Sequence, residues 1–188
     1  MRASACFLLV TAFITTTPVL AQQDALAPSI QTHMGHLKCG DARLTAATRY
    51  LDVPDHDRQV LTQTLELTIP DNGTTTTLAH DGHVFRQPFL KNTPVFDAAA
   101  TGWACLQASD GKLYLYIVYT CVESNARPKC VGTLREWARI FDTAGHPLTA
   151  NYPRSGRRTS TLMKKLGLGR YLNEGVSLSG IDEPARAQ

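Results

Sequence analysis

The sequence contains few charged residues and lacks the short motifs that mark the commonest catalytic sites. Asp, Glu, Lys and Arg make up 19% of its 188 residues, and the formal net charge is only +3. It has no H-E-x-x-H, no glycine-rich phosphate loop, no C-x-x-C and no Cys/His nucleophile pair. These absences argue against a zinc protease, a nucleotide-binding enzyme and a thiol oxidoreductase. Internal repeats and low-complexity segments are absent as well.

Beyond residue 21 the chain also lacks any apolar run approaching the ~20 residues that cross a bilayer. The first 21 residues are themselves typical of a secretory signal peptide. Arg2 precedes an apolar run at residues 5–14, and Val19-Leu20-Ala21 resembles a cleavage site. No cysteine follows that site, which argues against a lipoprotein anchor. We therefore expect cleavage near Ala21 and a periplasmic or secreted protein without a transmembrane anchor.

Cysteine is scarce, and Cys6 would be removed with the signal peptide, so four cysteines remain. An even number in an exported protein predicts disulfides. If Asp110-Gly111 forms a two-residue hairpin loop, Cys105 lies opposite Tyr116 and too far from Cys121 for a bond. We therefore predict the pairs Cys121–Cys130, at the base of a hairpin, and Cys39–Cys105.

Alternation of apolar and polar residues dominates the chain from Arg43 onward and predicts a mainly β fold. The expected strands are residues 43–50, 61–69, 74–78, 83–86, 101–107 and 112–120. Residues 133–142 fit a strand or a helix, and we favour the strand because it continues the meander. Residues 161–168 form the expected helix, with Ser160 as N-cap. The result is an antiparallel meander of about seven or eight strands, forming a sandwich or small barrel.

We divide the chain into four segments on this basis. Residues 1–21 are the signal peptide, and residues 22–38 are a flexible lead-in. Residues 39–181 form a single disulfide-stapled β-domain, which is long enough for a hydrophobic core. Residues 182–188 are a disordered tail.

The histidines suggest a metal site but do not complete one. His33-Met34-Gly35-His36 and His80-Asp81-Gly82-His83 are both H-x-x-H patterns, and imidazole suits zinc or copper. Both patterns fall in expected loops or turns, and no spacing supplies further ligands. Asp55 and Asp57 flank His56 in a segment whose composition is typical of a turn. Residues 175–180 resemble the G-x-S-x-G nucleophile elbow, but their last glycine comes one position too late. We expect no metal ion and no cofactor.

Two groups of residues are candidates for binding. Residues 151–170 carry no acid and six cations, Arg154, Arg157, Arg158, Lys164, Lys165 and Arg170. They form either a solvated loop or a surface for an anionic partner. The second group contains Trp103 and Trp137, which belong either to the core or to an exposed aromatic face.

These features favour an exported, non-catalytic binding module. Its expected partner is an acidic protein or an anionic envelope polymer, and nucleic acid is not expected in this compartment. In compartment, size and expected fold class the chain is similar to small exported β-proteins of bacterial envelopes, such as lysozyme inhibitors and periplasmic immunity proteins. Two alternatives stay open: a secreted hydrolase-type enzyme with dispersed His and Asp residues, and a structural envelope component.

Overall fold

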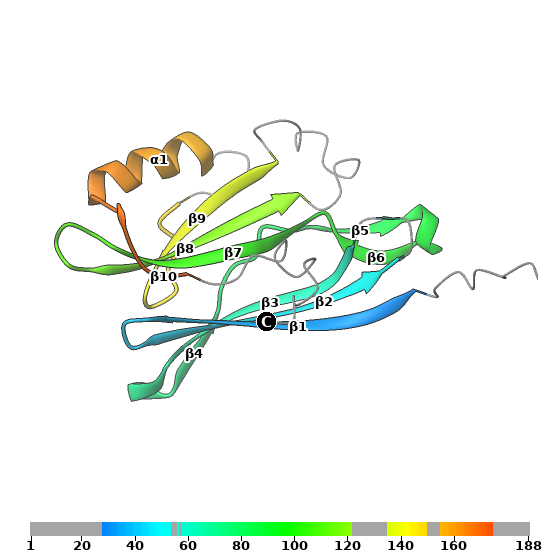
Figure 1. The fold of residues 1–188 in the computed structure, drawn as a ribbon, viewed down its shortest axis with the longest axis horizontal. Coiled ribbons are helices and arrows are strands. Elements are labelled where there is room, and N and C mark those ends of the chain that lie inside the picture. The colour runs from blue at the N-terminus through cyan, green and yellow to red at the C-terminus, as the bar shows by residue number, and fades with distance from the viewer. Residues whose placement is uncertain (1–27, 54–55, 57, 122–134, 150–154, 175–188) are drawn as a thin grey trace, which may run out of the picture.

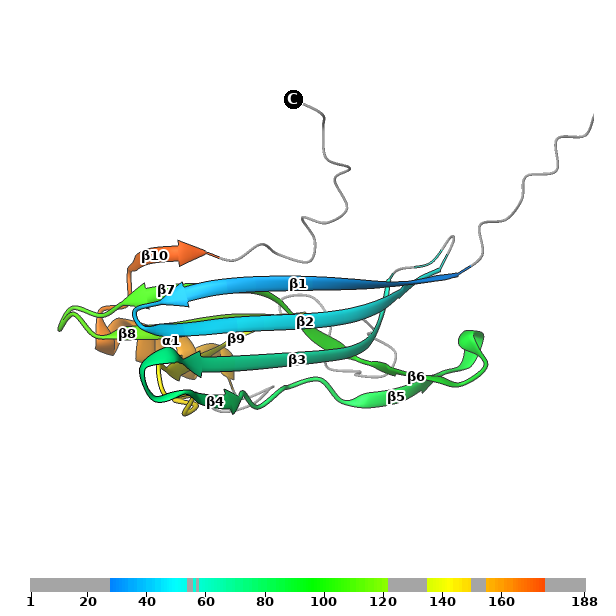
Figure 2. The same ribbon diagram turned by 90° about the horizontal axis from the view of Figure 1, so that it is seen from below.

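The computed structural model describes residues 28–53, 56, 58–121, 135–149 and 155–174. In this part of the chain, two four-stranded antiparallel sheets lie one over the other (Figures 1 and 2). The N-terminal sheet has the order β1 (Ser29–Cys39), β2 (Ala42–Asp52), β3 (Gln59–Ile69) and β4 (Thr74–Thr77). The C-terminal sheet has the order β10 (Arg170–Glu174), β7 (Ala98–Gln107), β8 (Leu113–Cys121) and β9 (Glu136–Asp142).

Smaller elements connect and cover these sheets. A two-stranded sheet of β5 (Val84–Gln87) and β6 (Thr93–Phe96) leads from one large sheet to the other. One-turn 3-10 helices, Pro70–Asn72 and Pro88–Leu90, follow β3 and β5. Helix α1 (Ser155–Leu166) lies on the outer side of the C-terminal sheet (Figure 1). No helix within the described ranges is long and apolar enough to cross a membrane.

A single hydrophobic core joins the two large sheets. Alternate residues of each strand point inward, as the period of two requires. The N-terminal sheet contributes Leu37, Leu44, Leu65 and Leu67, and the C-terminal sheet contributes Trp103, Leu115, Ile117, Tyr119, Trp137 and Phe141. The prediction of a mainly β, antiparallel fold is confirmed. The described strands do not close into a barrel.

Strand β1 corrects the expected lead-in, because Ser29–Cys39 pairs with β2 along its whole length. The inward positions of β1 include His33 and Gly35, so the sequence shows no apolar alternation there. Gly35 is required because the Trp103 ring packs against it: a Cβ at Gly35 would lie only 2.1 Å from Trp103 Cζ2. His33 and His36 therefore lie in a strand and not in a loop.

The β7–β8 hairpin is offset by one residue from the prediction. Ala108 N–H donates to Lys112 O at 2.8 Å, which closes a three-residue loop instead of a two-residue one. Gly111, with φ of 85°, supplies the left-handed residue that this loop needs. Cys105 consequently pairs with Leu115, where Tyr116 was expected.

The Cys39–Cys105 disulfide is confirmed, with 5.2 Å between the two Cα atoms. It joins the end of β1 to the middle of the C-terminal sheet. The other predicted pair includes Cys130, which lies outside the described residues, so that bond stays a prediction. One disulfide between described residues is therefore established.

Several other boundaries differ from the prediction. The described part contains ten strands, because β1, β6 and β10 were not expected. The strand preferred for residues 133–142 is confirmed as β9. Strand β5 pairs with β6 and not with β4, so residues 78–83 form a connection between sheets. Helix α1 begins at Ser155, which leaves the expected N-cap Ser160 inside the helix.

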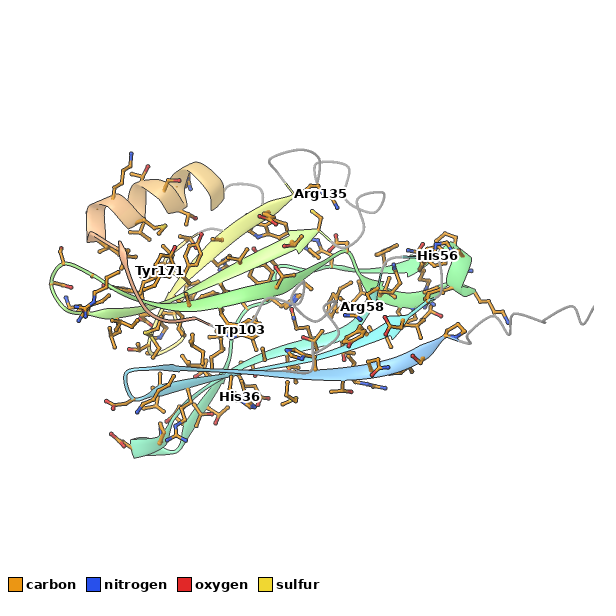
Figure 3. All side chains as sticks on the ribbon, in the orientation of Figure 1. His36, His56, Arg58, Trp103, Arg135 and Tyr171 are labelled. Atoms are coloured by element: carbon orange, nitrogen blue, oxygen red, sulfur yellow. A yellow bond between two sulfur atoms is a disulfide. The ribbon has the colours of Figure 1, made fainter. Side chains whose placement is uncertain are left out.

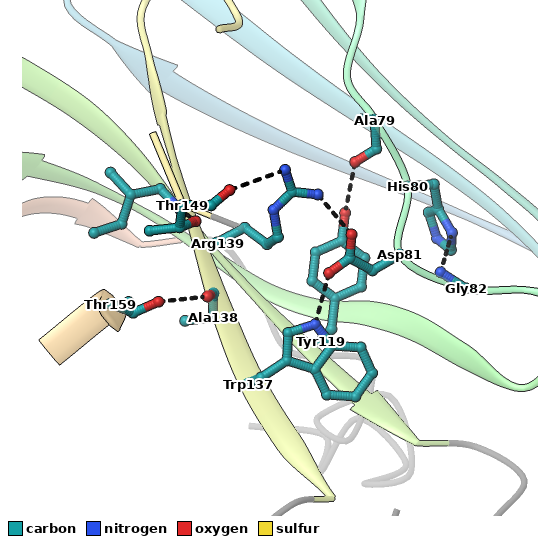
Figure 4. Close-up of polar contacts among 11 residues, drawn as sticks. Ala79, His80, Asp81, Gly82, Tyr119, Trp137, Ala138, Arg139, Thr149 and Thr159 are labelled. Atoms are coloured by element: carbon teal, nitrogen blue, oxygen red, sulfur yellow. Dashed lines mark hydrogen bonds and ion pairs between the residues drawn. The ribbon is translucent and has the colours of Figure 1, made fainter. Parts of the chain in front are cut away.

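A buried ion pair holds that connection in place. Arg139, inward-facing on β9, donates from Nη1 to Asp81 Oδ1, and the two side chains are 2% and 1% exposed. Trp137 Nε1 donates to Asp81 Oδ2 at 2.8 Å (Figure 4). Tyr119 donates its hydroxyl to Ala79 O at 3.3 Å in the same segment. The connection therefore closes the side of the core next to β9.

A second polar link joins the two large sheets through Gln63. Its Oε1 accepts from Ala100 N–H at 2.7 Å, and its Nε2 donates to Ala100 O and to Thr48 Oγ1, both at 2.8 Å. Oε1 also lies 2.7 Å from His80 Nε2, and His80 Nδ1 accepts from Gly82 N–H at 2.9 Å. Neutral His80 with its proton on Nε2 satisfies both contacts.

Candidate binding surface on α1 and β10

Helix α1 ends at a well-defined C-cap. Gly167 follows its last residue with φ of 62°. Gly167 N–H donates to Lys164 O at 3.2 Å, and Leu168 N–H donates to Met163 O at 2.9 Å, which is a Schellman motif. Ser109 N–H, from the β7–β8 loop, donates to Leu166 O at 3.1 Å. These bonds fix the position of the last helical turn on the C-terminal sheet.

The apolar side of α1 packs on the outer side of the C-terminal sheet. Leu162, Met163 and Leu166 are half-buried against a cluster formed by Ala104, Leu106, Ala108, Tyr114, Ile140 and Leu168. Thr159 is buried and donates its hydroxyl to Ala138 O at 3.1 Å (Figure 4). The apolar contacts come from the second half of α1 and the Thr159 bond from the first half, so the first half shows no apolar periodicity.

The opposite side of α1 is cationic. Arg158, Lys164 and Lys165 are exposed, and the helix contains no acidic residue. None of the three forms an ion pair with a residue of the described ranges. Arg158 and Lys165 are about 10 Å apart along the helix axis, at 1.5 Å per residue. The helix thus presents a positive ridge to solvent.

Two tyrosines lie beside this helix. Tyr171 of β10 pairs with Leu106, whose side chain packs under α1, so Tyr171 is on the same side of the sheet. Figure 3 shows Tyr171 next to the helix, and its side chain is 50% exposed. Tyr116 of β8 is half-buried on the same side. Burial, followed by the proximity of Tyr171 and Glu136, raises the Tyr116 pKa.

The α1–β10 surface is defined here as Arg158, Lys164, Lys165, Tyr116 and Tyr171. It combines tyrosines and an arginine, which are enriched at protein interfaces, with two lysines that add positive charge. The cations can pair with carboxylates, and the tyrosine rings offer apolar area with a polar tip. The arrangement is suited to recognition of an acidic surface.

Other residues predicted for binding lie elsewhere. Trp103 and Trp137 are 3% and 6% exposed, so their burial favours the core alternative over an exposed aromatic face. Arg154 and the side chain of Arg157 lie outside the described part. Arg170 is exposed at the start of β10 and donates to Gln107 Oε1 at 3.4 Å.

The histidines do not converge on a metal site. His33 and His36 face opposite sides of β1, since they are three residues apart in a strand. His83 lies beside Asp97, with 3.7 Å between Nδ1 and Oδ2, and His56 stacks on Phe89. Within the described ranges, no group of three or more His, Cys, Asp or Glu side chains could hold a metal ion. Asp55, Asp57 and residues 175–180 lie outside those ranges.

No protein-family model, curated protein or solved structure matches this chain.

Sequence reasoning missed Tyr171 as a surface residue. Tyr171 belongs to β10, which was not predicted. The sequence offered little signal for it, because Tyr171 is the one strand-favouring residue in the run from Arg170 to Asn173 that follows Gly169.

Proposed function

We propose that this protein is an exported, non-catalytic binding module that recognises the acidic surface of another protein through the α1–β10 surface. The observation that carries the proposal is the acid-free helix, whose three exposed cations form no ion pair with any described residue and lie beside two partly exposed tyrosines. On this proposal the two facing sheets act as a sandwich-type scaffold, and the protein works in the manner of an inhibitor or immunity protein.

Helix stability does not account for the position of these cations. Arg158 lies in the first turn of α1, where the helix dipole disfavours positive charge. A negatively charged partner would offset this cost. Lys164 and Lys165 lie in the last turn, where the dipole favours them, so Arg158 is the more informative residue.

The tyrosines favour a protein partner over a polymer at this surface. Interfaces between proteins depend on a few aromatic and arginine anchors surrounded by polar contacts. Tyr116 and Tyr171 supply such anchors, and the neighbouring cations supply complementarity and faster association with an acidic partner.

Charge reversal of the helix tests the proposal. The protein carrying Lys164→Glu and Lys165→Glu should lose a stoichiometric partner that the natural protein retains in size-exclusion chromatography of a periplasmic extract. A matched control carries Arg86→Glu and Lys91→Glu on the β5–β6 hairpin, which lies away from α1 (Figure 1). The control should keep the partner.

Two results would contradict the proposal. One is a complex that survives reversal of Lys164 and Lys165 as well as it survives the control. The other is the absence of a partner together with substrate turnover that is lost on substitution of His80 or His83, which would support the hydrolase alternative.

A further inference from the structure

The outer face of the N-terminal sheet is a second cationic surface, on the side of the molecule away from α1 (Figure 1). Residues of β1, β2 and β3 that point away from the core are exposed or half-exposed, and no described element lies over them. Most of these outward residues carry hydroxyls or positive charge. The hydroxyls belong to Thr32, Thr45, Thr62, Thr64 and Thr68.

Two arginines dominate the charge of this face. Arg43 and Arg49 are exposed on the outward side of β2 and form no ion pair with any residue that the structure describes. Six residues of strand separate them, a distance of about 20 Å. The strand pairing places Arg49 between Thr32 and Thr62, so hydroxyls flank it on both neighbouring strands. A small anion cannot reach both arginines, whereas an extended chain can.

The end of the face near Arg43 has further polar groups. Arg43 pairs with Lys38 on β1, which concentrates positive charge there. A shallow hollow is lined by residues 36–38 and 43–45. His36 points outward from β1 (Figure 3), and its Nδ1 lies 3.4 Å from Thr45 Oγ1 across the same strand pair. Glu66 is the single carboxylate among the outward residues of β1 to β4, so the face is net positive.

Two rows of outward residues lie between the arginines: His36, Thr45 and Glu66 form the first, and Met34, Ala47 and Thr64 form the second. Met34, 49% exposed, pairs with Ala47, so this pair lies between the rows of Arg43 and Arg49. The outward residues of the four strands include no aromatic side chain, and a protein interface would be expected to have such anchors. Threonine hydroxyls can bond sugar hydroxyls, and the C–H face of a sugar ring can pack on Met34 and Ala47.

We propose that this face binds an extended carboxylated polysaccharide that runs along β2. Arg43 and Arg49 pair with carboxylates of separate sugars, because guanidinium groups match carboxylate geometry. Threonine hydroxyls bond the sugar hydroxyls, and Met34 packs under a ring. The site is independent of the α1–β10 surface and does not rest on the protein partner proposed there.

Binding of polygalacturonate oligomers, measured by isothermal titration calorimetry at low salt, tests this site. The variant with Arg43→Gln and Arg49→Gln should bind about tenfold more weakly for each arginine removed, as charge-assisted hydrogen bonds imply. The control variant, with Arg86→Gln and Lys91→Gln on the β5–β6 hairpin, loses the same charge outside both proposed surfaces and should bind like the natural protein. Neutral dextran should not bind.

Three results would overturn the proposal. The first is equal weakening in both variants, because net charge alone would then explain binding. The second is binding of dextran as tight as that of polygalacturonate. The third is loss of the protein partner, instead of the oligomer, on substitution of Arg43 and Arg49, which would make this face a protein interface. Circular dichroism of each variant confirms that the sheet is intact.

Discussion

Replacing Asp81 with Asn should destabilise the fold strongly, because it leaves the positive charge of Arg139 buried without a counter-charge. The Arg139 side chain is 2% exposed and that of Asp81 is 1% exposed, so water cannot replace the lost partner. Removing one member of a buried pair costs about 3–5 kcal/mol. Asn keeps an oxygen for the Trp137 indole, so the expected loss is about 3–4 kcal/mol.

Urea unfolding with the disulfide intact measures this loss. With a slope of about 2 kcal/mol per M, the midpoint should fall by about 2 M. Adding Arg139→Met to Asp81→Asn removes the stranded charge and should recover about 2 kcal/mol of the loss, because a buried pair replaced by apolar groups is nearly neutral. The reasoning is refuted if Asp81→Asn costs less than about 0.5 kcal/mol, or if the two substitutions are additive.

Three further predictions concern the core. Replacing both Cys39 and Cys105 with Ala should lower stability by about 4 kcal/mol in chemical unfolding, since the bond closes a loop of 66-residue separation. Gly35→Ala should cost about 1–3 kcal/mol by the same measurement, because its methyl group would overlap the indole packed on it. Stability should fall as the pH rises above the ordinary tyrosine pKa of 10.0, because burial raises the folded-state pKa of Tyr116 and Tyr119, so unfolding then releases protons.

Controls make these results specific. Gly169→Ala introduces a methyl group with no atom within 4 Å and should change stability by less than about 0.5 kcal/mol. Reduction should lower the stability of the natural protein by more than that of the Ala variant, which retains only the predicted Cys121–Cys130 bond. A pH profile that rises between 10 and 12 would contradict the tyrosine argument.

The sequence predicted the parts of the fold that depend on local pattern. The strand around residues 61–69 alternates between apolar and polar residues except at Gln63, and the strand around residues 112–120 is a continuous apolar run. The Cys39–Cys105 pair followed from the geometry of a hairpin, even though its register was wrong by one residue. Cys121 stays distant from Cys105 in either register, so the one-residue error did not change the pairing.

The parts of the fold that the sequence did not predict depend on contacts between distant segments. Gly35 interrupts the pattern of β1 because Trp103, far along the chain, occupies the space of its side chain. The first half of α1 is held by the bond from Thr159 to the β9 backbone, which no helical periodicity indicates. Arg139 points to the same inward side of β9 as Trp137. Its charge is balanced by Asp81, which lies far from it in the sequence, so local pattern could not predict the pair.

The candidate surface was predicted in part. Lys164 and Lys165 were recognised from local charge, and they are exposed. Trp103 could have been surface or core from its sequence context, and its burial depends on the packing of two sheets. Tyr171 could not be assigned because β10 gains its place only by pairing with β7.

The most direct test of the central claim is lysine footprinting of the protein with and without its purified partner. Acetylation rates of Lys164 and Lys165 should fall on complex formation, while the rate of Lys91 on the β5–β6 hairpin should stay the same. Protection of Lys91, with Lys164 and Lys165 still reactive, would contradict the claim that the α1–β10 surface binds the partner.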